Sequence, residues 1–154
     1  MPAAISTDIY AGQASPLVRE RVEGQKVSGD IRSFLATYTA TGAEAASDVL
    51  SIVQLPVGAV LLADTLRVST DGVGGTTATL ATIGDSGAAA RYSATAVGIT
   101  SAATFAAVTG VNANAIAPYT VTKDTNVITA TLGLASGAFT AGKKVVIRGS
   151  YRMP

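Results

Sequence analysis

The sequence predicts an all-β fold, an antiparallel β-sandwich of about eight strands, and three observations support this. Apolar and polar residues alternate over short runs, and turn-forming residues separate these runs every 8–12 residues or so. Long helical periods are missing, which argues against parallel βαβ units. The length of 154 residues suits one domain, and the 48% apolar content comes mostly from small aliphatic residues, since only 5% is aromatic.

The alternating runs begin after residue 32, and each has its own pattern. Phe34, Ala36 and Tyr38 share one face of the first run. In the longest run, residues 60–69, strict alternation puts Asp64 on the more apolar face, so we expect it near a strand end or paired. We expect strands at 33–40, 49–55, 60–69, 76–83, 119–122, 126–134 and 143–152. In the second of these runs, the expected shared face carries Val49, Ser51, Val53 and Leu55.

The segment 88–110 supports two readings. Its alanine runs have high helix propensity, whereas the interleaved Thr, Tyr, Val and Phe favour strands. A short helix at 100–109 is therefore an alternative to a further strand. We expect a loop at 111–118 and a hairpin turn at 123–126.

Residues 1–32 differ from the rest and predict an extended N-terminal arm, with the sandwich domain at 33–154. The segment holds eight of the 21 charged side chains and shows no sustained period of two or 3.6. We expect the arm to gain order by lying on another surface, and the alternative is a frayed terminus.

The composition excludes much catalytic and binding chemistry. The chain has no His and no Cys, which removes the commonest general base, thiolate nucleophiles and the commonest metal ligands. We therefore expect no enzymatic activity, no cofactor and no metal centre, with a weak calcium site between loops as the remaining option. A net charge of +1 gives no basis for nucleic acid or an anionic membrane as partner, and we find neither a signal peptide nor a spanning segment.

Two glycine-containing motifs invite a catalytic interpretation. Gly84-Asp85-Ser86-Gly87 copies the tetrapeptide around the nucleophile of chymotrypsin-like serine proteases, but the chain lacks the histidine base. The glycines of 71–75 lack the lysine of a phosphate-binding loop. Turns between strands explain both motifs.

The last run carries a basic stripe. Lys144, Arg148 and Arg152 share one face by spacing, while Val145, Ile147 and Tyr151 take the other. The stripe fits an acidic partner or a neighbouring subunit, and the alternative is a solvated or edge strand that uses charge to discourage pairing. The candidate partner-binding residues, from the arm and this stripe, are Arg19, Arg21, Lys26, Arg32, Lys144, Arg148 and Arg152.

The residues between 48 and 92 carry a pattern that resembles a known class of proteins. There the run Leu55-Pro56-Val57-Gly58-Ala59 joins two expected strands, and Gly84-Asp85 and then Arg91-Tyr92 follow. With the closing run 146–151, this pattern resembles the small virion structural proteins of tailed phages, capsid decoration or cement proteins among them. The resemblance implies a jelly-roll-like sandwich, a homotrimer or homodimer, and binding to the major capsid protein at the outer capsid surface of the virion.

The leading hypothesis is therefore a non-enzymatic decoration or cement protein that bridges capsid subunits. One alternative is a tail, neck or head-fibre component. Another is a carbohydrate-binding or adhesive jelly-roll module, although the chain has no Trp for an aromatic platform. Fold alone does not separate these functions.

Overall fold

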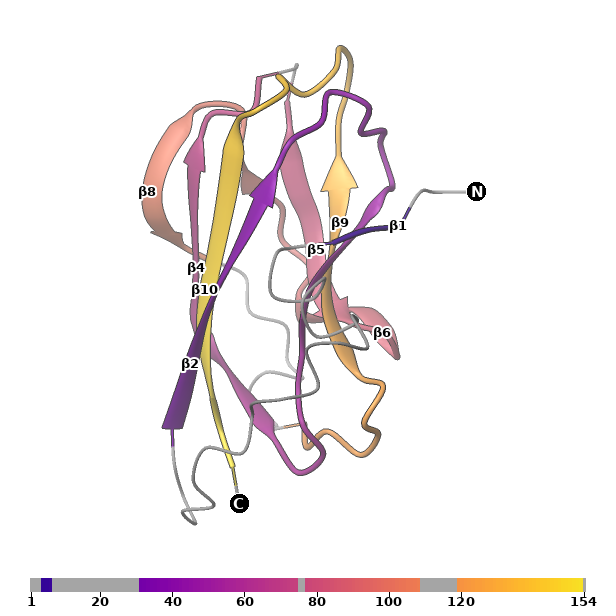
Figure 1. Cartoon of the computed structure of the whole chain (residues 1–154), viewed down its shortest axis with the longest axis vertical. Helices are drawn as coiled ribbons and strands as arrows, with labels where there is room; N and C mark the ends of the chain where they lie inside the picture. Colours follow the sequence, from indigo (N-terminus) through magenta and orange to yellow (C-terminus); the bar gives the residue numbers. More distant parts are fainter. Residues whose placement is uncertain (1–3, 7–30, 75–76, 109–118, 154) are drawn as a thin grey trace.

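A computed structural model describes residues 4–6, 31–74, 77–108 and 119–153, and all its regular structure is β (Figure 1). Within these ranges there is no helix long and apolar enough to cross a membrane. The strands are β1 (Ala4–Ser6), β2 (Ile31–Thr39), β3 (Val49–Gln54), β4 (Val60–Asp71), β5 (Thr79–Asp85), β6 (Ala88–Ser93), β7 (Val97–Gly98), β8 (Ala102–Ala107), β9 (Val127–Gly133) and β10 (Lys144–Arg152).

The strands form two sheets that face each other, as predicted. One has the order β2-β10-β4-β8, and the other has the order β1-β3-β9-β5-β6 with β7 also paired to β5. In Figure 1 the first sheet stands on the left and β9 and β5 on the right. Consecutive strands from β2 to β5, and from β8 to β10, lie in opposite sheets. Together with the strand order of the two sheets, this connectivity is that of a jelly roll. All pairs are antiparallel except β1 with β3.

The core lies between the sheets and follows the predicted alternation where the ladders are regular. In β2, Phe34, Ala36 and Tyr38 are buried, and in β10 the buried side chains include Val145 and Ile147. The largest fully buried side chains come from both sheets, and each contributes roughly 1.5–3 kcal/mol by leaving water. They include Leu50, Ile52, Leu66, Leu80, Ile83, Ile128 and Ile147.

Two strands depart from the predicted alternation because each contains an irregularity. In β3 the register shifts between Ser51 and Val53, so Leu50 and Ile52 are buried rather than Val49 and Ser51. In β4 the inward face changes along the strand, and the expected position of Asp64 on the apolar face is wrong, because Asp64 is exposed. A β-bulge adds residues to one strand and thereby exchanges the faces beyond it.

Several boundaries differ from expectation. The alternative helix at 100–109 is wrong, since Ala102–Ala107 is the strand β8. Residues 119–122 form no strand, and Thr120 makes only an isolated bridge to Val60. The expected hairpin at 123–126 is a turn, closed by the Asn126 amide on the Lys123 carbonyl at 3.2 Å, that leads into β9.

The structure describes only part of the expected N-terminal arm. Within it, β1 pairs with β3 of the sandwich. Strand β2 begins at Ile31, two residues before the predicted domain boundary. Residues 7–30, and the predicted loop at 111–118, lie outside the described residues.

Candidate interaction surface

The outer face of β10 carries the predicted basic stripe. Lys144, Arg148 and Arg152 are exposed there, while Val145, Ile147 and Tyr151 are buried on the inner face. The prediction that the three cations share a face is confirmed. The edge-strand alternative is wrong, because β10 lies between β2 and β4.

The strands beside β10 place two kinds of side chain next to these cations. On β2, Ile31 stands opposite Arg152 and Leu35 opposite Arg148. Both aliphatic side chains are exposed, Ile31 by 68% and Leu35 by 53%. An aliphatic column on the edge strand therefore runs alongside the basic column of β10.

On β4, Arg67 stands directly opposite Arg148. Residues opposite each other in an antiparallel pair project from the same face, and like charges in such a pair are destabilising. Leu66 and Val68 are buried, so Arg67 projects outward beside Arg148. This arginine pair is the feature of the surface that the sequence did not predict.

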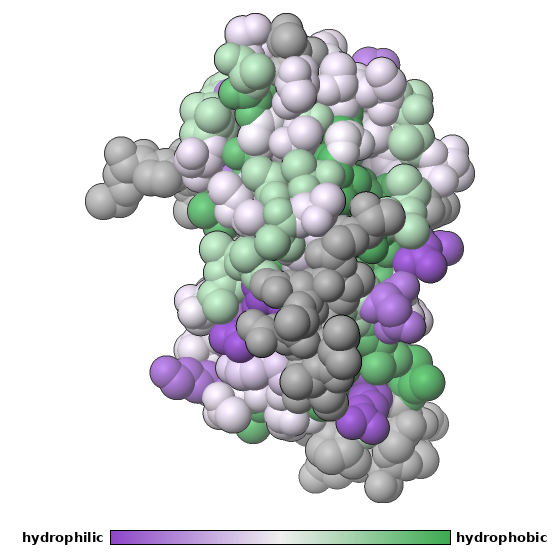
Figure 2. Space-filling view, turned by 180° about the vertical axis from the view of Figure 1, so that it is seen from behind, coloured by the Kyte–Doolittle hydropathy of each residue, from purple (hydrophilic) through white to green (hydrophobic). Residues whose placement is uncertain are grey.

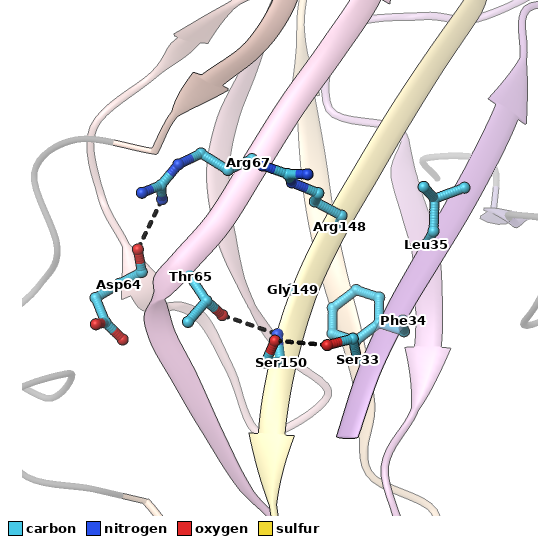
Figure 3. Close-up of a pocket in the computed structure, with 9 residues that line it drawn as sticks. All are labelled: Ser33, Phe34, Leu35, Asp64, Thr65, Arg67, Arg148, Gly149 and Ser150. Atoms are coloured by element: carbon cyan, nitrogen blue, oxygen red, sulfur yellow. Dashed lines mark hydrogen bonds between the residues drawn. The ribbon is translucent and has the colours of Figure 1, made fainter. Parts of the chain in front are cut away.

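A hollow of about 590 Å³ lies over this arginine pair (Figure 3). It exists because Gly149 alone stands opposite four residues of β4, 63–66, where the pairing register shifts. Strand β4 therefore bulges away from β10 at this point. The lining residues come from β2, β4 and β10 and are Ser33, Phe34, Leu35, Asp64, Thr65, Arg67, Arg148, Gly149 and Ser150.

Polar side chains replace the ladder hydrogen bonds that the bulge removes. The Ser150 amide donates to Thr65 Oγ1 at 2.8 Å, and Thr65 Oγ1 donates to the Leu62 carbonyl at 2.6 Å. On the β2 side, where the ladder is regular, the hydroxyls of the register partners Ser33 and Ser150 lie 2.9 Å apart. The hydrogen bonds of Thr65 hold the bulge that forms the hollow.

Arg67 is anchored in the same way. Its Nη1 donates to the carbonyls of Asp64 and Leu66 at 2.7 and 2.8 Å. In Figure 3 the Asp64 carboxylate points away from this guanidinium. Among the described residues, Arg67 forms no ion pair with a carboxylate.

The remaining candidate residues are not gathered on this face. Arg32 stands opposite the buried Tyr151, so alternation places it on the inner side of the sheet near its end. Arg19, Arg21 and Lys26 lie outside the described residues. The structure thus brings together Lys144, Arg148 and Arg152 of the predicted set and adds Arg67.

The protease-like tetrapeptide forms the turn between β5 and β6. Asp85 Oδ1 accepts the amides of Gly87 and Ala88 at 2.9 and 2.8 Å, and its Oδ2 lies 2.6 Å from Arg91 Nε. The Ser86 hydroxyl lies 3.0 Å from Asn126 Oδ1. These contacts hold the turn in place and match the turn interpretation of the motif.

A second buried carboxylate, Glu44, closes the loop between β2 and β3. It accepts hydrogen bonds from the Tyr38 hydroxyl, the Thr41 hydroxyl and amide, and the Gly42 amide. Burial alone would raise the pKa of Glu44, but the hydrogen bonds from Tyr38 and Thr41 outweigh it and hold this pKa below its usual value. Within the described ranges, His, Cys, Asp and Glu side chains form no group of three or more that could hold a metal ion.

Comparison with known proteins finds likeness at the level of structure alone. No protein-family model and no curated protein sequence matches the chain. A chain in the capsid of Ralstonia phage GP4 matches with a TM-score of 0.62 and 21% identity, over 99% of both chains. A chain in the capsid asymmetric unit of cyanophage Pam1 matches with a TM-score of 0.54 and 24% identity, over 91% of this chain and 96% of that one. At these identities the comparisons establish a shared fold, and they do so almost from end to end.

Proposed function

We propose that this protein is a non-enzymatic capsid decoration or cement protein of a tailed phage, which binds the outer capsid surface and stabilises the shell by bridging capsid subunits. The observation that carries the proposal is the fold shared with chains of two phage capsids over nearly their whole length. Mutual coverage of this extent means that the matched chains are themselves of similar size. A small chain in a capsid suits an accessory role.

The surface of the sandwich supports such a role. Arg148, Arg152 and Lys144 form a basic column beside the exposed Ile31 and Leu35. Interfaces between proteins combine apolar contact with polar groups around it, and arginine is enriched in them. On the side seen in Figure 2, most strongly hydrophilic side chains lie in the lower half, and the upper half is mostly pale or green. With only 14% charged residues, such a surface has few ionic groups to desolvate on contact.

The absence of catalysis is part of the proposal. Ser86 occupies the position of the nucleophile in the protease-like tetrapeptide. Its hydroxyl is hydrogen bonded to the side chain of Asn126, and the chain holds no histidine to activate it. Asp85 is occupied by two amides and Arg91. The polar groups that suggested chemistry thus have structural partners.

Co-sedimentation with shells tests the proposal. Shells of the phage that encodes this chain, prepared without it, are mixed with the purified protein and pelleted. We expect saturable binding with a fixed number of copies per shell, and no additional uptake by shells that already carry the protein. Absence of binding to bare shells, with the protein folded, would contradict the proposal and favour a tail, neck or fibre component.

The expected N-terminal arm is tested in the same assay. A variant lacking residues 1–30 keeps β2 intact but loses β1, so its circular dichroism spectrum is compared with that of the full chain first. We expect the folded truncated protein to bind shells more weakly, because an arm that orders on contact adds buried surface. Equal binding by both forms would remove the arm from the attachment mechanism.

A further inference from the structure

The row Leu35–Arg148–Arg67 crosses three neighbouring strands on the outer face of the sheet. Leu35 is the register partner of Arg148 on one side, and Arg67 is its register partner on the other. The backbone positions of these three lining residues therefore form a row across the strands, and in Figure 3 the Arg67 guanidinium turns from this row toward the Asp64 carbonyl. Because strands lie about 4.8 Å apart, the row spans about 10 Å, the length of about three extended residues.

From this row we infer that the hollow is the docking site for an extended acidic segment of the capsid subunit, whose carboxylates contact Arg148 and Arg67 while an aliphatic side chain packs on Leu35. The inference rests on the proposed function, since it takes the capsid subunit as the source of the segment. It adds the chemistry of that segment and the residues that recognise it.

The charge of the site favours an acidic partner. Two of the side chains that line the hollow, Arg67 and Arg148, carry guanidinium groups, and a bound carboxylate would be attracted to both. The one acidic residue of the lining, Asp64, offers Arg67 its backbone carbonyl, and its carboxylate points away. The charge of the hollow is thus complementary to an acidic partner.

The orientation of Arg67 favours a carboxylate as the bound group. A guanidinium has five N–H donors in a planar fork, and here Nη1 is committed to the carbonyls of Asp64 and Leu66. The edge formed by Nε and Nη2 has the geometry that binds a carboxylate with two parallel hydrogen bonds. The bulge holds this side chain in position before any partner arrives, which lowers the entropy cost of binding.

The aliphatic end of the row favours a partner that also carries an apolar side chain. Leu35 is 53% exposed on the edge strand β2, and the site continues along the sheet to the exposed pair Ile31 and Arg152, which also stand opposite each other. The combination of aliphatic and arginine side chains thus occurs twice, four residues apart along the strands. A partner that bound through charge alone would leave the side chains of the aliphatic column, Ile31 and Leu35, exposed to water.

Shell binding by matched variants tests the inference. Arg148→Glu should weaken binding by about tenfold or more, because it removes one charged contact and adds a repulsive one. Arg148→Lys keeps the charge but loses the two-pronged geometry, so its binding should fall between that of the wild type and Arg148→Glu. Lys123→Glu, at an exposed turn outside both sheets, makes the same charge change and should bind as the wild type does.

The contact with Leu35 is tested by a second pair of variants, in which the control makes the same kind of change at another exposed aliphatic residue. Leu35→Asp should reduce shell binding, and Val57→Asp should not, because Val57 is 52% exposed but lies in the bend between β3 and β4. All variants are first compared with the wild type by thermal denaturation. If Arg148→Glu and Leu35→Asp bind shells as tightly as their controls do, the inference is wrong and the proposed function stands.

A titration without shells separates the two proposals. A soluble five-residue peptide with one leucine and two glutamates is added to isotopically labelled protein, and a peptide with glutamines in their place is the control. We expect saturable changes in the amide resonances of Leu35, Arg148 and Ser150 with the acidic peptide only, lost in Arg148→Glu. If the wild type fails to bind shells but shows these changes, the docking chemistry is supported and the proposed function is not; if the amides do not respond and shells do not bind, both are overturned.

Discussion

Gly149 is the residue at which the core and the outer hollow meet on β10. A Cβ atom placed there would lie 2.8 Å from Phe34 Cζ and 2.9 Å from Leu66 Cδ2, closer than real carbon contacts. We expect Gly149→Ala to lower the free energy of unfolding by about 1–3 kcal/mol, because the buried rings and branches must shift to admit the methyl group. Urea denaturation measures this, with Gly98→Ala as control, since a Cβ there meets no atom within 4 Å. Similar losses in both variants would contradict the packing argument.

Glu44 makes the stability of the fold dependent on pH. Its pKa is lower in the folded protein than the ordinary value of 4.5, so the unfolded chain takes up the proton first as the pH falls. The stabilisation by the carboxylate is therefore complete above the ordinary pKa and is lost as the pH falls through the folded one. Glu44→Gln should destabilise the protein by about 1–3 kcal/mol at neutral pH.

The pH dependence distinguishes this effect from a simple loss of packing. The difference in unfolding free energy between the wild type and Glu44→Gln should shrink as the pH falls below 4.5, because the wild-type carboxyl takes up a proton first in the unfolded chain and then in the folded one. Tyr38→Phe removes one donor to the same carboxylate and should show a smaller difference with the same trend. Denaturation at several pH values measures both, and a difference that is constant with pH would refute the role of the charge.

At the scale of strands, the bulge of β4 is held by Thr65. Its hydroxyl accepts the Ser150 amide at 2.8 Å and donates to the Leu62 carbonyl at 2.6 Å. Thr65→Val keeps the shape but leaves both groups without this partner, so we expect a loss of about 1–3 kcal/mol in stability. Thr104→Val, on the exposed part of β8, is the matched control and should change stability little. Equal stability of Thr65→Val and wild type would show that solvent replaces the hydroxyl.

The same bulge shows where prediction from sequence ends. Alternation placed the buried faces of β2 and β10 correctly, because their mutual pairing has no register shift. It misplaced Asp64, because the bulge of β4 depends on Gly149 and Ser150 of β10. Ser150 is 85 residues away in sequence from Thr65, the residue to which its amide donates. A single strand carries no signal of how its partner will be registered against it.

The candidate surface, too, could be predicted from the sequence only in part. The spacing within β10 was enough to group Lys144, Arg148 and Arg152, since residues two or four apart share a face. The pairing of Arg67 with Arg148 and the position of β10 inside its sheet arise only from the order β2-β10-β4. For β8, tertiary pairing with β4 overrides the helix propensity of its alanines.

For the whole molecule, one strand links the core to the surface. The inner face of β10 buries Val145 and Ile147, and its outer face presents the basic column. Because β2 and β4 pair with it on both sides, the column has little freedom to move relative to the core. A backbone held in this way suits repeated, identical contacts, since only the side chains of the column lose conformational entropy at each one.

Repeated contacts give the cement proposal a measurable consequence for the shell. A protein that binds only the intact shell stabilises it by about 2.7 kcal/mol for each site at a free concentration of a hundred times Kd. Summed over many sites, even modest affinity should raise the temperature at which shells open, measured by calorimetry and by release of packaged DNA. Shells incubated with Arg148→Glu at the same concentration should open at a temperature closer to that of bare shells, and Lys123→Glu should match the wild type. A tail, neck or fibre component occupies few positions on the particle, so it would leave the opening temperature of the shell unchanged. Binding to many sites with no rise in that temperature would mean that the protein decorates the capsid without bridging its subunits.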